Sequence, residues 1–222
     1  HGADRKGQPV LRRKMRRGQG LKFFAGMPPC LIGMEACASA HYWAREIEAL
    51  GHEVRLIPPQ YVKPFVKTNK NDAADAEAIC EALVRPTMHF ASVKSADQQS
   101  ALMLHRAREL LVRQRTMLIN ALRGHCSEFG IVVSQGAVRV NELIAIIEDT
   151  NDARLPSLAR EALGALVAQL HTIKTEVADL ERRLKAWHRS HETSRQLATI
   201  PGVGVITATA LVATIGDGSQ FK

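Results

Sequence analysis

Two carboxylates stand three residues apart at the expected start of a helix. Asp72 and Asp75 follow the polar residues 67–71, and apolar residues then recur at helical spacing as far as Val84. Asn and Asp often cap the free N–H groups of a first turn, so the helix should begin at Asn71 or Asp72. At about 100° per residue, both acids share a side with the apolar residues, so we expect both to point along the buried face. Buried carboxylates need compensation, and a divalent cation is one common form of it.

The same two acids also have a purely structural interpretation, because acids in a first turn complement the helix dipole. A third acid, Glu35, ends the apolar run 30–35, which is typical of a strand buried on both faces. In layered α/β domains, reactive groups gather at the carboxyl ends of strands, so Glu35, Asp72 and Asp75 can converge there. The alternative is that Glu35 is simply solvated where its strand ends.

Strands and helices alternate over the first 94 residues. We expect strands at 9–15, 30–35, 53–57 and 89–93, with helices at 20–25, 39–50 and from residue 72 on. The turn at 4–7 needs a preceding strand, which we do not expect this chain to contain. The alternation predicts an α/β layered domain over residues 1–94.

Long helices are expected from residue 95 onward. Residues 95–129 lack Pro and have no Gly before Gly124, with leucines at heptad-like intervals. A second segment keeps an apolar residue every three or four positions, and its members are Leu155, Leu158, Ala162, Leu166, Leu170, Ile173, Val177, Leu180, Leu184 and Trp187. Globular helices are seldom so long, so residues 95–190 should form a helical hairpin or coiled-coil arm. Such an arm packs on itself or mediates dimerisation.

The charge and the cysteines limit the class of protein. A net charge of +8 favours a polyanionic partner. Four widely spaced cysteines without a C-x-x-C pair suggest reduced, buried thiols, which are typical of the cytoplasm. The first residues lack the apolar segment of a signal peptide, and no apolar run is long enough to span a bilayer.

Two further features suggest phosphate binding. The first long helix carries arginines with few balancing acids, among them Arg106, Arg113, Arg115 and Arg123. A solvated helix face is the alternative. Gly202 and Gly204 form a tight turn like that of a helix-hairpin-helix motif, which can aim backbone N–H groups at a phosphate. A plain connector between helices is the other interpretation.

Five stretches together resemble one family in the right order along the chain. They are residues 34–37, 58–64, 67–76, 113–120 and 200–204. The chain resembles the DEDD-type insertion-sequence transposases of the insertion sequence 110 group, whose first domain is similar to RuvC Holliday-junction resolvases. The resemblance implies an RNase H/RuvC-like layered domain over 1–94, a coiled-coil arm over 95–190, and the start of a helical C-terminal domain over 191–222.

The resemblance also implies roles for individual residues. The family's tetrad has an Asp on the first strand, a Glu at a later strand end and two Asp on a helix. The last three match Glu35, Asp72 and Asp75, whereas the first is expected upstream of His1. The family's nucleophilic serine is expected beyond Lys222, because Ser219 does not match its motif. We therefore expect a transposase shortened at both ends, and its status as an active enzyme stays open.

The implied chemistry is DNA cleavage and strand exchange, with the three carboxylates holding one or two Mg²⁺ (or Mn²⁺) ions. Lys67, Lys70 and the arginines would contact backbone phosphates. The implied partners are DNA, a structured guide RNA and further copies of the chain, in the cytoplasm of a prokaryote at the nucleoid. The alternatives are a RuvC-like nuclease acting alone, and a non-catalytic remnant that binds nucleic acid or dimerises.

Overall fold

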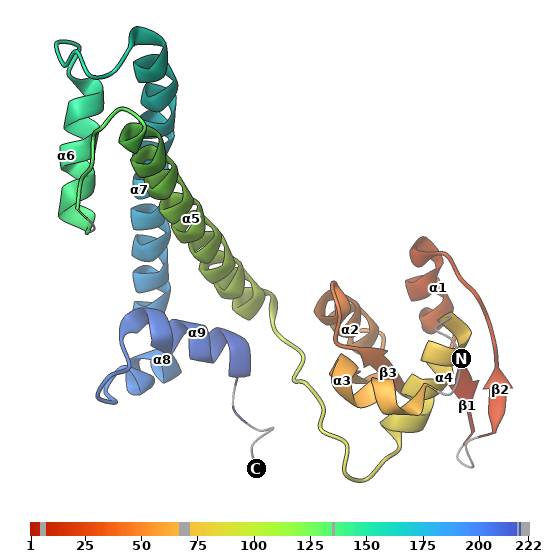
Figure 1. The fold of residues 1–222 in the computed structure, drawn as a ribbon. Helices are drawn as coiled ribbons and strands as arrows, with labels where there is room; N and C mark the ends of the chain where they lie inside the picture. Colours follow the sequence, from red (N-terminus) through yellow and green to blue (C-terminus); the bar gives the residue numbers. More distant parts are fainter. Residues whose placement is uncertain (5–7, 67–71, 135, 217, 219–222) are drawn as a thin grey trace. The chain divides into compact units, whose positions relative to one another are not determined.

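The computed structural model describes residues 1–222 except 5–7, 67–71, 135, 217 and 219–222 (Figure 1). The chain divides into two compact units, residues 1–99 with 215–222, and residues 100–214. The first unit combines strands with helices, and the described residues of the second form helices and loops. The mixed α/β class predicted from the sequence is therefore confirmed.

The first unit contains two small sheets. Strands β3 (Leu31–Glu35) and β4 (Glu53–Ile57) pair in parallel, with helix α2 (Ala40–Glu48) between them in the chain. Strands β1 (Gly2–Ala3) and β2 (Pro9–Leu11) pair antiparallel. The chain was not expected to contain the strand that precedes the turn at 4–7. The structure shows this strand as the two residues of β1.

Helices α2 and α4 (Asp72–Leu83) cover opposite faces of the β3–β4 sheet. Side chains alternate between the two faces of a strand, and β4 follows this rule. Leu56 packs with the buried residues of α2, whereas Ile57 packs with Ala78 and Leu83 of α4. Each helix therefore has its own core on one side of a shared sheet.

Two predicted strands are shorter than expected. The strand predicted at 9–15 ends at Leu11, where a run of cations with no alternating apolar residues begins. The strand predicted at 89–93 makes only an isolated bridge between Ala91 and Leu56. The backbone groups of the next residue, Lys94, form hydrogen bonds with side chains of α2. Arg45 donates to the Lys94 carbonyl (2.6 Å), and the Lys94 N–H donates to Nδ1 of His41 (3.2 Å).

Shorter helices complete the first unit. They are η1 (Arg17–Gln19), α1 (Gly20–Ala25), α3 (Pro59–Val62) and η2 (Lys63–Phe65). Buried His52 joins α1 to β3, since its Nε2 lies 2.9 Å from the Phe24 carbonyl oxygen and its Nδ1 accepts from the Cys30 N–H (3.2 Å). This anchor fixes the start of β3 beside α1.

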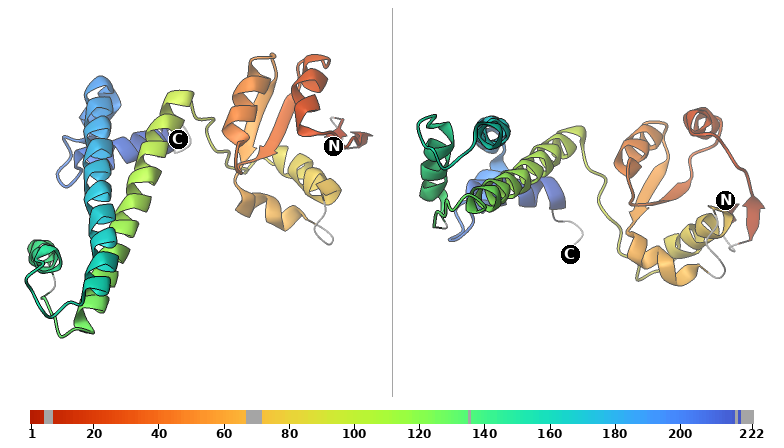
Figure 2. Two further views of the ribbon diagram at one scale, coloured as in Figure 1. Left: turned by 90° about the horizontal axis from the view of Figure 1, so that it is seen from above. Right: turned by 45° about the horizontal axis from the view of Figure 1, so that its top comes forward.

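The second unit is a helical hairpin with a smaller helical end. Its elements are α5 (Ala96–Ser127), α6 (Ala137–Glu148), α7 (Ser157–Ser190), α8 (Glu192–Leu197) and α9 (Val205–Ile215). Helices α5 and α7 run antiparallel (Figure 2), and Arg108 of α5 pairs with Glu181 of α7 at 2.6 Å. A core cluster unites α5, α6 and α7 through Leu122, Leu143 and Leu170. The arm therefore packs on itself.

The buried stripe of α7 differs from the predicted one in its first turns. Leu170, Ile173, Val177 and Leu184 are buried as predicted. Leu158 is 77% exposed and Ala162 is also exposed, whereas Leu163 and Val167 are buried in their place. A spacing of three and four residues fits both the stripe through Leu158 and Ala162 and the stripe through Leu163 and Val167. Because α6 packs against this part of α7, the stripe through Leu163 and Val167 is the buried one.

None of the described helices combines the length and the apolar character that crossing a bilayer requires. The four cysteines are free thiols, but the prediction that they are buried holds only for Cys126, since Cys37 is exposed and the other two are half-buried.

His105 joins α5 and α9, the first and last helices of the second unit. Its Nε2 lies 3.0 Å from Oγ1 of buried Thr209 on α9, whose hydroxyl lies 2.9 Å from the Val205 carbonyl oxygen. Burial, and to a smaller extent the neighbouring Arg108, lowers the pKa of His105. Both effects disfavour the imidazolium, so the folded unit holds this ring neutral.

We therefore expect the second unit to lose stability on acidification. The unfolded chain, in which histidine has a pKa of about 6.5, binds the proton more readily than the folded one. The stability that His105 contributes is thus present above that pH and lost as pH falls through it. The midpoint of urea unfolding should fall less between pH 7.5 and 5.5 in His105→Gln than in the wild type. The exposed His125 is the matched control, and a His125→Gln variant that gave the same flattening would contradict this origin.

Candidate functional site

Helix α4 rests directly on β3 at Gly33. A Cβ atom on Gly33 would lie 3.0 Å from Cγ2 of Ile79 and 3.0 Å from Cδ2 of Leu83. Such distances are shorter than ordinary van der Waals contact, so a residue larger than glycine would require these side chains or α4 itself to shift. The contact sets α4 against the strand that ends in Glu35.

Glu35 lines an open hollow at the carboxyl end of β3. The hollow has a volume of about 250 Å³, and its lining consists of Gly33, Met34, Glu35, Cys37, Ala38, Ser39, Ala40, Trp43 and Ile79. Glu35 is half-buried and pairs in register with Ile57 of β4. Its side chain is thus held by a strand and shares a hollow with residues of α2 and α4.

The turn after Glu35 is tightly held. The Ala36 N–H donates to the Ile57 carbonyl (2.8 Å), and the Cys37 N–H donates to the Glu35 carbonyl (2.8 Å). Ser39 then takes a left-handed conformation, with φ of 68°, just before α2 begins. A residue other than glycine in this region carries strain, and such strain is concentrated at functional sites. The turn therefore gives Glu35 a rigid setting.

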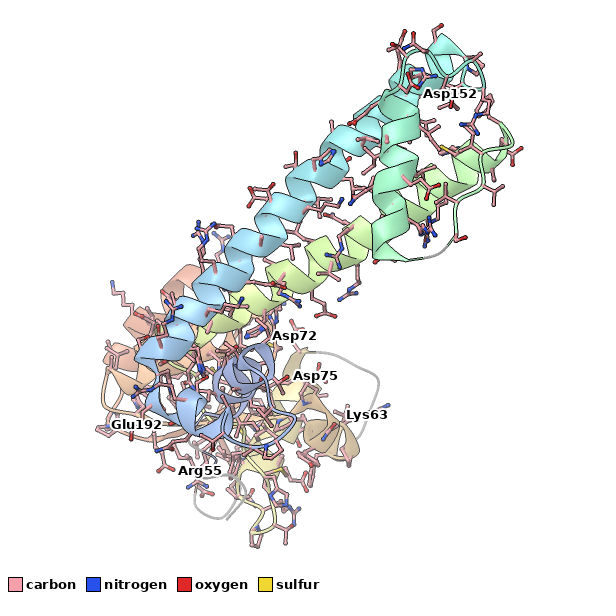
Figure 3. All side chains as sticks on the ribbon, turned by 90° about the vertical axis from the view of Figure 1, so that its left-hand side faces the viewer. Arg55, Lys63, Asp72, Asp75, Asp152 and Glu192 are labelled. Atoms are coloured by element: carbon pink, nitrogen blue, oxygen red, sulfur yellow. The ribbon has the colours of Figure 1, made fainter. Side chains whose placement is uncertain are left out.

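The two aspartates of α4, which Figure 3 labels, differ in environment. Asp75 is half-buried and lies one turn before Ile79, which lines the Glu35 hollow. Asp72 is 93% exposed, and its Oδ2 lies 3.8 Å from Nζ of Lys14. The prediction that both acids point along the buried face is therefore wrong for Asp72. Asp72 is the first residue of α4 and lies two turns, about 10 Å along the axis, before Ile79, which meets β3 at Gly33.

The donor chemistry of Glu35, Asp72 and Asp75 suits a hard divalent cation, because carboxylate oxygens are the ligands that Mg²⁺ prefers. Among the described residues, however, no three His, Cys, Asp or Glu side chains are grouped closely enough to hold a metal ion. The structure thus places Glu35 and Asp75 on elements in contact, and it leaves Asp72 in solvent. The expected convergence of all three remains a prediction.

The arginines of α5 do not share one face. Arg106 and Arg113 are exposed and seven residues apart, and Arg113 pairs with Glu109 at 2.7 Å. Arg115 is half-buried and, at about 100° per residue, lies opposite Arg106. Arg123 donates to the carbonyls of residues 134 and 136 at 3.3 Å each, so it holds a loop in place. Only the exposed arginines suit the predicted phosphate contacts.

The remaining candidates lie in two other segments. Lys67 and Lys70 lie outside the described residues. Gly202 and Gly204 lie in the predicted turn between α8 and α9, and Gly202 has a φ of 87°. That conformation favours glycine, whereas a Cβ on either glycine would meet no atom within 4 Å. The turn is confirmed, and its binding of phosphate stays a prediction.

One basic surface was missed by the sequence reasoning. Residues 12–17, here called the basic segment, contain five of the six cations between residues 12 and 22, a stretch without any acid. Arg12 lies 3.9 Å from Glu77 of α4, and Lys14 lies 3.8 Å from Asp72. The basic segment therefore runs beside the acids of α4. The uninterrupted charge was a usable signal, but residues 12–15 had been assigned to a predicted strand.

Comparison with known proteins gives a consistent result. A family model of the DEDD type, described as a transposase, matches residues 12–130, and a second, described as "Transposase IS116/IS110/IS902 family", matches residues 194–222. The whole chain is 47% identical to the "Probable family 20 transposase" of Pseudomonas aeruginosa and covers 66% of it. It is 42% identical to the "Transposase for insertion sequence element IS1328" of Yersinia enterocolitica, again over the whole chain, and covers 65% of that protein. A Coxiella burnetii relative, "Transposase for insertion sequence element IS1111A", is 36% identical over 99% of this chain, which covers 60% of it.

Proposed function

We propose that this chain, which belongs to the IS116/IS110/IS902 family of transposases, holds DNA and supplies acidic residues for the cleavage and exchange of its strands. The chain spans 60 to 66% of the length of the three relatives compared. The observation that carries the proposal is the seating of α4 on β3 through Gly33, beside the strand end that carries Glu35. Similarity to transposases along the whole chain favours this function over that of a nuclease acting alone.

Glu35, Asp72 and Asp75 would hold a divalent cation, Mg²⁺ or Mn²⁺. When bound, such an ion polarises a phosphodiester and stabilises the charge that develops on its oxygens. Glu35 and Asp75 would bind it from a strand and a helix that are already packed together. The covering of one sheet by α2 and α4 supports an RNase H/RuvC-like layering for residues 1–94.

The partners form part of the same proposal. Arg106 and Arg113, with Lys67 and Lys70, would contact phosphates of DNA or of a structured guide RNA. Residues 95–190 would form the arm and residues 191–222 the start of a C-terminal domain, which acts with a further copy of the chain. The setting would be the prokaryotic cytoplasm, at the nucleoid.

Binding of Mn²⁺ tests the acidic residues without requiring a complete reaction. In a titration followed by electron paramagnetic resonance, Glu35→Gln and Asp75→Asn should each weaken binding by about tenfold or more, because each replaces an anionic carboxylate ligand with a neutral amide. The matched control is Glu77→Gln, which removes a half-exposed acid from the same helix. Equal Mn²⁺ affinity in all four proteins would refute the assignment.

A further inference from the structure

A second open hollow lies near the first and has aromatic and cationic walls. We call it the aromatic hollow. It has a volume of about 410 Å³ and is lined by Arg17, Gly18, Leu21, Tyr42 and Trp43. Trp43 lies against Gly20, where a Cβ would be 3.4 Å from the indole ring. Tyr42 is 44% exposed, and its ring meets that of Trp43 edge-on with centroids 5.6 Å apart. Two adjacent aromatic side chains thus remain accessible to a flat ligand.

Among the residues that the structure describes, no carboxylate pairs with the cations beside these rings. The guanidinium carbon of Arg17 lies 5.7 Å from the centroid of the Trp43 ring, and that of Arg13 lies 5.4 Å from that of Phe23. Among the described residues, no ion pair includes Arg13, Arg16 or Arg17. An exposed cluster of like charges favours an anionic ligand that spans several of them.

We infer that the aromatic hollow and the basic segment bind an unpaired nucleotide of a nucleic-acid strand. A base would stack on the exposed ring of Tyr42 and meet the nearly perpendicular ring of Trp43 edge-on, while Arg13, Arg16 and Arg17 bind the adjoining phosphates. A purely apolar ligand would leave the cations unused, and a free phosphate would leave the rings unused. A nucleotide uses both. The inference rests on the proposed function, since it names the part of the substrate that this surface takes.

The aromatic hollow lies beside the candidate acidic site. Trp43 lines both this hollow and the hollow of Glu35. The basic segment also extends from Lys14, beside Asp72, to Arg17, beside Trp43. A nucleotide stacked on Trp43 therefore lies next to the candidate acidic site. The surface would hold a strand with one base out of the stack, and it should favour single strands over a regular duplex.

Fluorescence of Trp43 tests this contact directly. The chain has two tryptophans, so a Trp187→Phe background leaves Trp43 as the reporter. The probes are single strands of about 12 nucleotides, one of DNA and one of RNA, with a DNA strand of equal length in which every base is absent. Both base-containing strands should quench the emission more than the abasic strand. The strand that binds more tightly identifies the source of the nucleotide.

Substitutions separate stacking from charge. Tyr42→Ala should weaken binding of the base-containing strands about 5- to 150-fold, whereas Tyr42→Phe retains it. The chain's other tyrosine, Tyr61, is 38% exposed and lies outside the aromatic hollow, so Tyr61→Ala is the matched control. Replacing Arg16 and Arg17 by Gln should reduce the slope of log K against log salt by about 1.4.

The outcomes distinguish this inference from the function on which it rests. Strand binding that is unchanged in Tyr42→Ala, with wild-type circular dichroism, would overturn the aromatic hollow and leave the proposed function standing. Quenching of Trp43 that is equal for abasic and base-containing strands would also overturn it. If the wild type bound neither single strands nor duplex DNA, the proposed function would fail as well.

Discussion

Replacing Leu170 by Asp should unfold the helical hairpin of the second unit. Leu170 is fully buried in the cluster where α5, α6 and α7 meet. The substitution removes the packing of a core leucine and places a carboxylate among apolar side chains, so we expect a loss of about 4 kcal/mol or more in the free energy of unfolding. Urea unfolding followed by far-ultraviolet circular dichroism measures this loss.

Leu158 on the same helix is the matched control. It has the same side chain and belongs to the same predicted stripe, but it is 77% exposed. Leu158→Asp should therefore change stability by only about 0.5 kcal/mol. Light scattering should give one mass for both variants and the wild type, because this chain's own helices cover Leu170. A Leu170→Asp variant with reduced mass and intact helicity would instead identify the stripe as a dimer interface.

The Leu158 and Leu170 pair also illustrates how far helical periodicity predicts a core. Spacing of three and four located the long helix and four of its buried residues. It did not identify the residues that face inward in the first turns, because Leu158 and Leu163 fit the pattern equally well. The packing of α6 decides between them, and that contact joins residues far apart in sequence. Local pattern contains no information about such a neighbour.

The same limit explains the candidate site. The strand ending at Glu35 and the helix beginning at Asp72 follow from local signals, and both were predicted correctly. The exposure of Asp72 depends on where β3 ends relative to α4, which only the tertiary contact at Gly33 sets. The aromatic hollow was missed for a related reason. Trp43 falls within the helix predicted at 39–50, and its proximity to Arg17 becomes visible only in the fold.

Replacing Gly33 by Val should displace α4 from β3. The new Cβ would stand 3.0 Å from both Ile79 and Leu83, and the γ-methyl groups of Val add further volume in the same gap. Overpacking of this kind should cost the first unit about 3 kcal/mol of stability. Urea unfolding of the first unit, followed by Trp43 fluorescence in the Trp187→Phe background, measures it. Gly18→Val is the control, since a Cβ there meets no atom within 4 Å.

A double-mutant cycle tests whether the cost comes from that contact. Leu83→Ala alone should destabilise by about 2 kcal/mol or more, because it empties part of a buried site. In combination with Gly33→Val it provides room for the valine, so the two losses should sum to about 1 to 2 kcal/mol less than if they were independent. Full additivity would mean that α4 is not seated on β3 at this point. Asp75 would then have no fixed position relative to Glu35, and the proposed metal site would lose the contact that holds its strand and its helix together.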